Sequence, residues 1–137
     1  MVSVPVQAEK IADIILSSND KILLVSIRNW NGNILAVKSR DSFRQRFIGV
    51  DSLIGSTYSG SLTVATLGLV NEVKNIFGEA RTIITFYDKC KVILLPIPSF
   101  GIIVGLTIER SPPETEEEKE QSYSIASKVE RLVVDTL

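Results

Sequence analysis

Three strand-like runs follow one another with very little chain between them, and this spacing most constrains the fold. The runs cover residues 82–87, 91–95 and 102–108, and the turns between them are Asp88-Lys89 and residues 98–101. A parallel pair of strands needs a crossover of a dozen or more residues, whereas two to five residues suffice for a hairpin. The three runs are therefore predicted to be antiparallel neighbours in one sheet.

A second hairpin is predicted nearer the amino terminus. Residues 22–27 and 34–37 are short runs rich in β-branched side chains, and Asn29-Trp-Asn-Gly-Asn33 separates them. The Asn31-Gly32 pair tolerates the positive φ that a tight hairpin turn demands. Together with the later runs, this hairpin gives five strands.

Apolar residues at helical spacing predict three helices. The first covers residues 6–16, the second starts near residue 61 and ends at Gly78, and the third covers residues 115–137. Thr115 and Glu118 fit a capping box, and the acidic run that follows suits the positive end of a helix dipole, although it could also form an acidic binding surface. The core-facing stripe of the second helix is predicted to comprise Leu62, Ala65, Thr66, Leu69, Val73, Ile76 and Phe77.

The predicted order is α-β-β-α-β-β-β-α, in a single domain over residues 1–137. We expect an α+β fold with a five-stranded antiparallel sheet and helices on both faces, because the runs at 22–27 and 102–108 are apolar throughout. The second helix should cover one face and the two terminal helices the other. The pattern leaves the structure of residues 38–60 open.

This order, and four segments in particular, resemble the roadblock (dynein light chain) family within the profilin-like group. The segments are Lys21-Ile-Leu-Leu-Val-Ser-Ile-Arg28, the Asn31-Gly-Asn33 turn, Asn33-Ile-Leu-Ala-Val-Lys38 and the run at 102–108. The resemblance implies a non-catalytic protein that dimerises through the long helix and the edge strand after it. It also implies a small GTPase, a motor or a signalling assembly as partner. PAS and GAF domains share similar layouts and would instead hold a small molecule.

The second helix indicates a homodimer independently of that resemblance. Small residues line the boundary between its two apolar faces, where another helix could approach closely, and the run after it could pair with a second copy as an edge strand. Alternatively, residues 38–60 fold over this face. The predicted interface residues are Ser61, Val64, Ala65, Leu67, Gly68, Thr82 and Ile84.

Composition excludes several kinds of chemistry. The chain has no His, so it can build neither a Ser-His-Asp triad nor an imidazole metal site, and its one cysteine, Cys90, cannot form an internal disulfide. The loop at residues 55–60 has the glycine spacing of neither a Walker nor a dinucleotide-binding motif. We therefore expect no enzyme activity, no cofactor and no metal.

Partner contacts are predicted at the basic segment and at the hairpin loop. If residues 40–48 are helical, Arg40, Arg44 and Arg46 could share a face for phosphate or an acidic protein, or they could simply be solvated. Trp30 either folds back on the sheet or serves as an exposed anchor. Nucleic acid is not expected, because 15 basic residues face 16 acidic ones and the pI is about 5.5.

Neither a secretory signal nor a membrane span is expected. Residues 1–7 lack a basic region followed by an apolar run, and prolines and glycines interrupt the most apolar stretch, residues 92–108. We therefore expect a cytoplasmic protein. The leading functional prediction is a dimeric interaction or regulatory module. The alternative is a small-molecule sensor with a pocket of about 300 Å³ between the sheet and residues 38–60.

Overall fold

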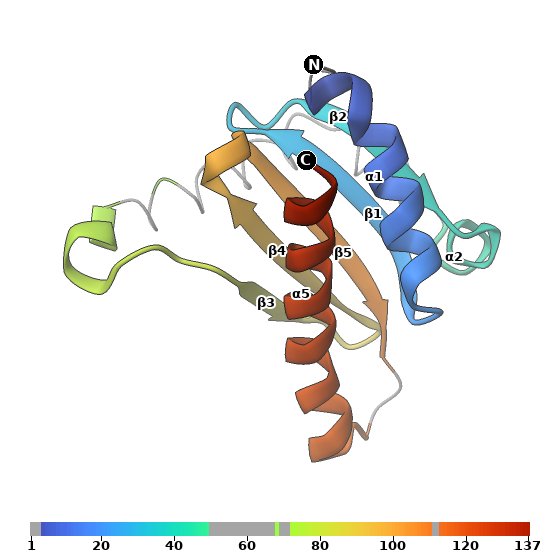
Figure 1. The fold of residues 1–137 in the computed structure, drawn as a ribbon. Coiled ribbons are helices and arrows are strands. Elements are labelled where there is room, and N and C mark those ends of the chain that lie inside the picture. The colour runs from blue at the N-terminus through green and yellow to red at the C-terminus, as the bar shows by residue number, and fades with distance from the viewer. Residues whose placement is uncertain (1–3, 50–67, 69–71, 111–112) are drawn as a thin grey trace.

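Five antiparallel strands form one sheet in the computed structural model, which describes residues 4–49, 68, 72–110 and 113–137. The spatial order is β2-β1-β5-β4-β3, and every neighbouring pair is antiparallel (Figure 1). This confirms the fold class expected from the short connections. The strands are β1 (Ile22–Asn29), β2 (Ile34–Ser39), β3 (Ile83–Phe86), β4 (Cys90–Ile97) and β5 (Ile102–Glu109).

The turn between β1 and β2 is built as the Asn-Gly signal predicted. The amide of Gly32 donates to the Asn29 carbonyl at 3.0 Å, and Gly32 adopts a φ of 83°. The Asn29 side chain accepts hydrogen bonds from the amides of Asn31 and Asn33, each at 3.0 Å. Gly32 therefore takes the left-handed conformation that an L side chain rarely adopts.

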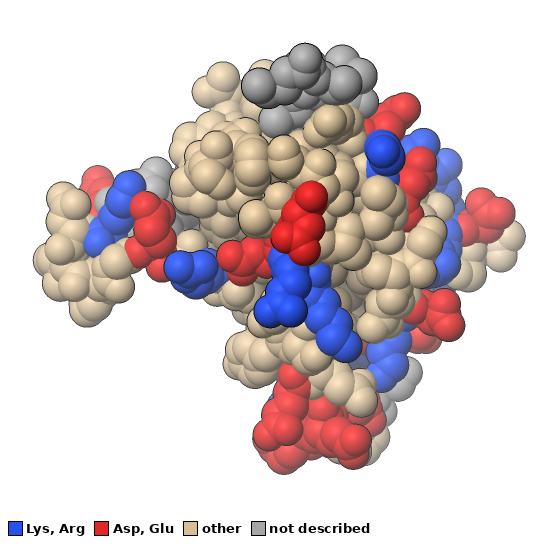
Figure 2. Space-filling model, viewed as in Figure 1, with Lys and Arg blue, Asp and Glu red and all other residues tan. Residues whose placement is uncertain are grey.

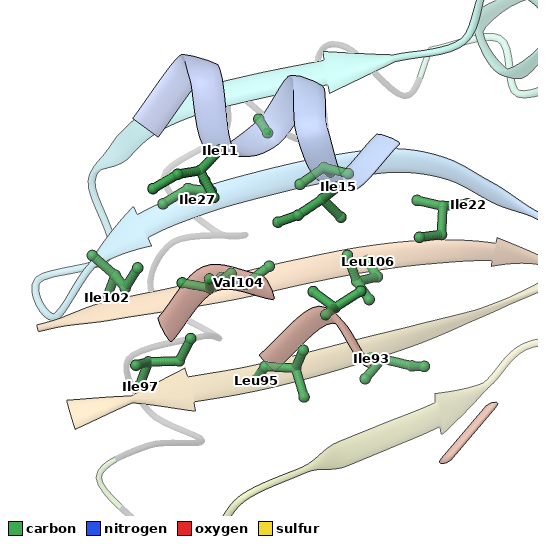
Figure 3. Packing of buried hydrophobic residues seen from close by; sticks show 14 of the residues in the cluster. Ile11, Ile15, Ile22, Ile27, Ile93, Leu95, Ile97, Ile102, Val104 and Leu106 are labelled. Atoms are coloured by element: carbon green, nitrogen blue, oxygen red, sulfur yellow. The ribbon is translucent and has the colours of Figure 1, made fainter. Parts of the chain in front are cut away.

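The main core lies between the sheet and the two terminal helices, α1 (Val4–Ser18) and α5 (Glu116–Thr136), which cover the same face (Figure 1). The α1 stripe at i, i+3, i+4 and i+7 is fully buried, as its spacing predicted. Figure 3 shows Ile11 and Ile15 of α1 directed at strand residues such as Ile27. The buried helical residues are Ala8, Ile11, Ala12, Ile15, Ile125, Ala126, Val129 and Val133.

The start of α5 is capped as expected. The Thr115 hydroxyl accepts a hydrogen bond from the Glu118 amide at 3.1 Å. The first turn carries Glu116, Glu117 and Glu118, where the helix dipole favours negative charge. Figure 2 shows acidic side chains gathered at this end of the molecule.

Part of the segment that the sequence left open forms a short helix, α2 (Asp41–Arg46). Its Phe43 is 2% exposed and packs against Leu23 and Leu24 of β1. The ring centroids of Phe43 and Phe47 lie 4.9 Å apart. Residues 50–60 of this segment lie outside the described part of the chain.

The predicted long helix lies mostly outside the described residues, but its carboxyl end is visible. Residues 72–77 are helical, and Gly78 ends them with a φ of 84° and a bond from its amide to the Lys74 carbonyl at 2.8 Å. The prediction that Val73, Ile76 and Phe77 face the core is wrong, because they are 38%, 79% and 79% exposed. The reason is that this helical segment projects away from the sheet (Figure 1).

Candidate interaction surface

Strand β3 forms one edge of the sheet, as the dimer hypothesis requires. Within the described part of the chain it pairs with β4 on one side only, through Ile83↔Leu94 to Phe86↔Lys91. The Tyr87 amide donates to the Cys90 carbonyl at 2.9 Å, so by antiparallel alternation the backbone groups of Ile84 and Phe86 point away from β4. An edge with such free groups is a template for pairing with another strand.

Exposed apolar side chains accompany this edge. Ile76 and Phe77 precede β3 at 79% exposure each, whereas Phe86 and Tyr87 lie at its far end at 47% and 52%. We call these four residues together with the β3 backbone the β3 edge surface. Large exposed apolar groups at both ends of an edge strand are candidates for contact with another chain.

Of the seven predicted interface residues, the described part of the chain contains three. Gly68 is exposed, and no atom lies within 4 Å of a Cβ added there. Thr82 is exposed immediately before β3, and Ile84 lies on it with its side chain against the main core. Ser61, Val64, Ala65 and Leu67 lie outside the described residues, so their role stays a prediction.

The sequence did not identify the four apolar residues of the β3 edge surface as exposed. Ile76 and Phe77 continue the periodic stripe of the preceding helix, and periodicity alone assigns such a stripe to the chain's own core. The usable signal is their position just before Gly78. A helix that ends there can leave its last turn beyond the edge of the sheet.

The three predicted arginines do not form one basic surface. Arg40 is directed inward: its Nε donates to the Ile22 carbonyl at 2.8 Å, and its Nη2 donates to the carbonyls of Leu16 and Asn19 at 2.5 and 3.0 Å. These groups belong to the end of α1 and the turn after it, where a cation also complements the helix dipole. Arg40 therefore joins α1, β1 and α2.

The other two arginines are exposed on α2 with separate partners. Arg44 donates from Nε to the Ser39 hydroxyl at 2.9 Å, whereas Arg46 pairs with Glu109 at 2.9 Å and lies 5.4 Å from the Phe47 ring. The carboxylate of Glu109 offsets the charge of Arg46.

Trp30 lies at the opposite end of the β1–β2 hairpin from α2. Register pairs run from Leu24↔Ser39 beside α2 to Arg28↔Ile34 beside the loop. Trp30 is half-buried, between the two alternatives that the sequence left open. Trp30 and Arg44 therefore cannot be neighbouring parts of one small contact patch.

The described residues contain no group of three or more Cys, Asp and Glu side chains placed to hold a metal. The Cys90 thiol is half-buried, and burial raises its pKa although the positive charge of Arg46 opposes this effect. None of the described helices is long and apolar enough to cross a membrane.

The described surface contains a pocket of about 270 Å³ between α5 and the strand ends. Ile108 and Ile125 contribute its apolar lining. Its polar lining includes Lys21, Lys91, Glu109, Glu114, Glu118, Gln121 and Ser122. The pocket is thus smaller, more charged and differently placed than the one a sensor was expected to hold beside residues 38–60.

Comparison with known proteins shows the fold. No family model and no curated protein sequence matches the chain. Among solved structures, Myxococcus xanthus MglB matches with a TM-score of 0.62 at 12% identity, covering 99% of this chain and 93% of that one. A Roadblock/LC7 domain from Streptomyces avermitilis matches with a TM-score of 0.58 at 12% identity, covering 93% and 92%.

A third match is the gliding protein MglB from Thermus thermophilus. Its TM-score is 0.57 at 12% identity, with 98% of this chain and 95% of that one covered. The chain therefore has a roadblock-like fold over nearly its whole length, as the hairpin and strand order indicated.

Proposed function

We propose that this roadblock-fold chain is a non-catalytic regulatory module that works as a homodimer and binds a small GTPase or another signalling protein. The observation that carries the dimer is the β3 edge surface. It combines an edge strand whose outward backbone groups have no sheet partner among the described residues with exposed Ile76, Phe77, Phe86 and Tyr87. A second copy would supply both a strand and an apolar cover.

The oligomeric state tests this proposal directly. One chain has a mass of 15.1 kDa, and we expect light scattering during size-exclusion chromatography to give twice that mass at micromolar concentration. A chain that keeps the single-copy mass at the highest attainable concentration would contradict the proposal.

A matched pair of variants locates the interface. Ile76 and Ile48 are both exposed isoleucines, at 79% and 93%, but Ile48 follows α2 and is far from the β3 edge surface in sequence. Removing the apolar burial of Ile76 in both copies costs about 3–4 kcal/mol, so Ile76→Asp should raise the dimer Kd by roughly two to three orders of magnitude. Ile48→Asp should leave the Kd within about twofold. Equal effects of the two variants would mean that the interface lies elsewhere.

The GTPase or signalling partner rests on the resemblance of the chain to the roadblock family, and Arg44, which is exposed on α2, is the contact we test. Binding of purified small GTPases, loaded with GDP or a GTP analogue, can be measured by calorimetry against the native chain. We expect one nucleotide state to bind, with Arg44→Ala weakening it about tenfold and the exposed control Lys10→Ala changing it little. Trp30→Ala tests the opposite end of the hairpin separately.

The sensor alternative receives less support from the geometry. Phe43 and Phe47 fill the space where α2 meets β1, so this part of residues 38–60 packs against the sheet without a ligand. The pocket under α5 is the better place to test for small molecules. A sensor would show saturable binding and thermal stabilisation with a specific metabolite, whereas the proposed module would not.

A further inference from the structure

One buried carboxylate, that of Glu114, pairs with two cations beneath the start of α5. Glu114 is 2% exposed in its side chain and pairs with Lys91 of β4, which is 5% exposed, and with Arg110 just after β5. Arg110 donates from Nε to Glu114 Oε2 at 3.1 Å. Lys91 Nζ also reaches the backbone carbonyl of Glu118 in α5 at 3.5 Å.

The charge balance makes Glu114 the member on which the others depend. A single carboxylate lies between two cations, and no buried polar side-chain atom among the described residues lacks a hydrogen-bond partner. Removing the carboxylate would leave a buried ammonium and a guanidinium facing each other without compensation. An uncompensated buried charge is strongly unfavourable.

Arg110 connects this cluster to the β3 edge surface. Its Nη1 donates to the Tyr87 carbonyl at 2.6 Å, and its guanidinium carbon lies 5.4 Å from the centroid of the Phe86 ring. Phe86 and Tyr87 are the two residues at the far end of β3. A partner that contacts Phe86 or Tyr87 therefore contacts residues to which Arg110 binds directly.

The first turns of α5 depend on few other contacts. Residues 116–121 are exposed or half-buried, and the buried positions of the helix begin at Ser122. In Figure 1 this end of α5 extends past the sheet, and the pocket of about 270 Å³ lies beside it. Besides the Thr115 cap, the hydrogen bonds that join these turns to other described elements are Lys91 to Glu118 and Lys21 to Gln121. Such a segment opens more readily than a packed helix.

We propose that the Glu114 cluster couples the β3 edge surface to the first two turns of α5, so that occupation of β3 and docking of these turns stabilise each other. The part of this inference that concerns a second copy at β3 rests on the proposed function. Coupling of this kind is reciprocal and typically changes an equilibrium by about 5- to 150-fold.

Hydrogen exchange of the full chain tests the coupling in a way that does not need the dimer. At a concentration where the chain is monomeric, Phe86→Ala removes the ring under Arg110, and we expect the hydrogen-bonded amides of residues 118–121 to exchange at least about fivefold faster. Thr85→Ala, an exposed neighbour on β3, is the control and should change them less than twofold. Equal rates in the two variants would overturn the coupling.

A second experiment tests the reciprocal effect by changing the carboxylate of Glu114. Glu114→Gln should speed exchange at the amides of residues 118–121 and raise the dimer Kd at least about fivefold, whereas Glu116→Gln, whose side chain is 88% exposed, should do neither. Faster exchange in α5 with unchanged Kd and no effect of Phe86→Ala would reduce Glu114 to a local anchor and refute the inference. A chain that never dimerises would refute the proposed function, and the Phe86 comparison would still decide the coupling.

Discussion

Replacing Arg40 by Lys distinguishes a structural arginine from a partner-binding one. Its guanidinium donates three hydrogen bonds to carbonyls at the end of α1 and the start of β1. An ammonium keeps the positive charge but cannot reproduce the planar fork that reaches Ile22 through Nε and Leu16 and Asn19 through Nη2.

The magnitude follows from the number of bonds lost. A hydrogen bond to a charged group contributes about 1.5–3 kcal/mol when it is made, and a lysine can retain one of the three. Since Arg40 is partly buried and water can replace some contacts, we expect Arg40→Lys to lower the free energy of unfolding by about 2–4 kcal/mol. The exposed Arg44→Lys should change it by less than about 0.5 kcal/mol.

Urea unfolding followed by far-ultraviolet circular dichroism measures both variants, with unchanged slopes as the condition for comparison. Measurement at a fixed protein concentration is essential if the chain dimerises. Equal stability of Arg40→Lys and the native chain would show that the three carbonyl contacts contribute nothing. Arg40 would then return to the set of candidate partner contacts.

Three further predictions concern the sheet and α5. A Cβ on Gly105 would lie 2.5 Å from Ser26 Oγ but 3.6 Å or more from its other neighbours. Gly105→Ala should therefore lower the free energy of unfolding, measured in urea, by about 1–3 kcal/mol in the native chain but by under about 1 kcal/mol in a Ser26→Ala chain. Equal losses in both chains would refute this steric explanation. Burial raises the pKa of the Glu114 carboxyl, but bonds and charges from Lys91 and Arg110 outweigh it and hold that pKa below its ordinary 4.5. The native chain should therefore exceed Glu114→Gln in free energy of unfolding by a constant amount above about pH 5. This difference should shrink as the pH falls below 4.5 toward the lower pKa of Glu114 in the folded chain. A difference that grows on acidification would contradict the direction of the pKa shift. Thr115→Ala should lower the free energy of unfolding by about 1 kcal/mol and should speed hydrogen exchange most at the Glu118 amide, which loses its acceptor. A uniform acceleration of exchange along α5 would argue against a local cap.

Local patterns predicted most of the fold because the features that carry them act over short distances. The stripe from Ala8 to Ile15 is fully buried, and Gly32 takes the positive φ that its turn requires. Connection lengths alone were enough to make the last three strands antiparallel. These are properties of neighbouring residues, so a single sequence contains them.

The candidate site was predicted less well because its contacts join distant parts of the chain. Arg40 donates hydrogen bonds to carbonyls 18 to 24 positions earlier in the chain, and Lys91 pairs with Glu114, which lies 23 positions later. The periodic spacing of apolar residues does not predict contacts between residues so far apart in the sequence. The exposure of Ile76 and Phe77 was missed for a related reason, since an apolar residue that stays exposed looks the same in one sequence as a residue of the chain's own core.

The strand order has a consequence for how the chain reaches its native state. β1 lies against β5, so Val25 pairs with Leu106, and the middle of the sheet is assembled from opposite ends of the polypeptide. Loop closure over that many residues is entropically costly and slow relative to local hairpins. A nascent chain must therefore wait for β5 to be synthesised before β1 can gain its central neighbour, and cleavage between β2 and β3 should yield two fragments that fold only when mixed.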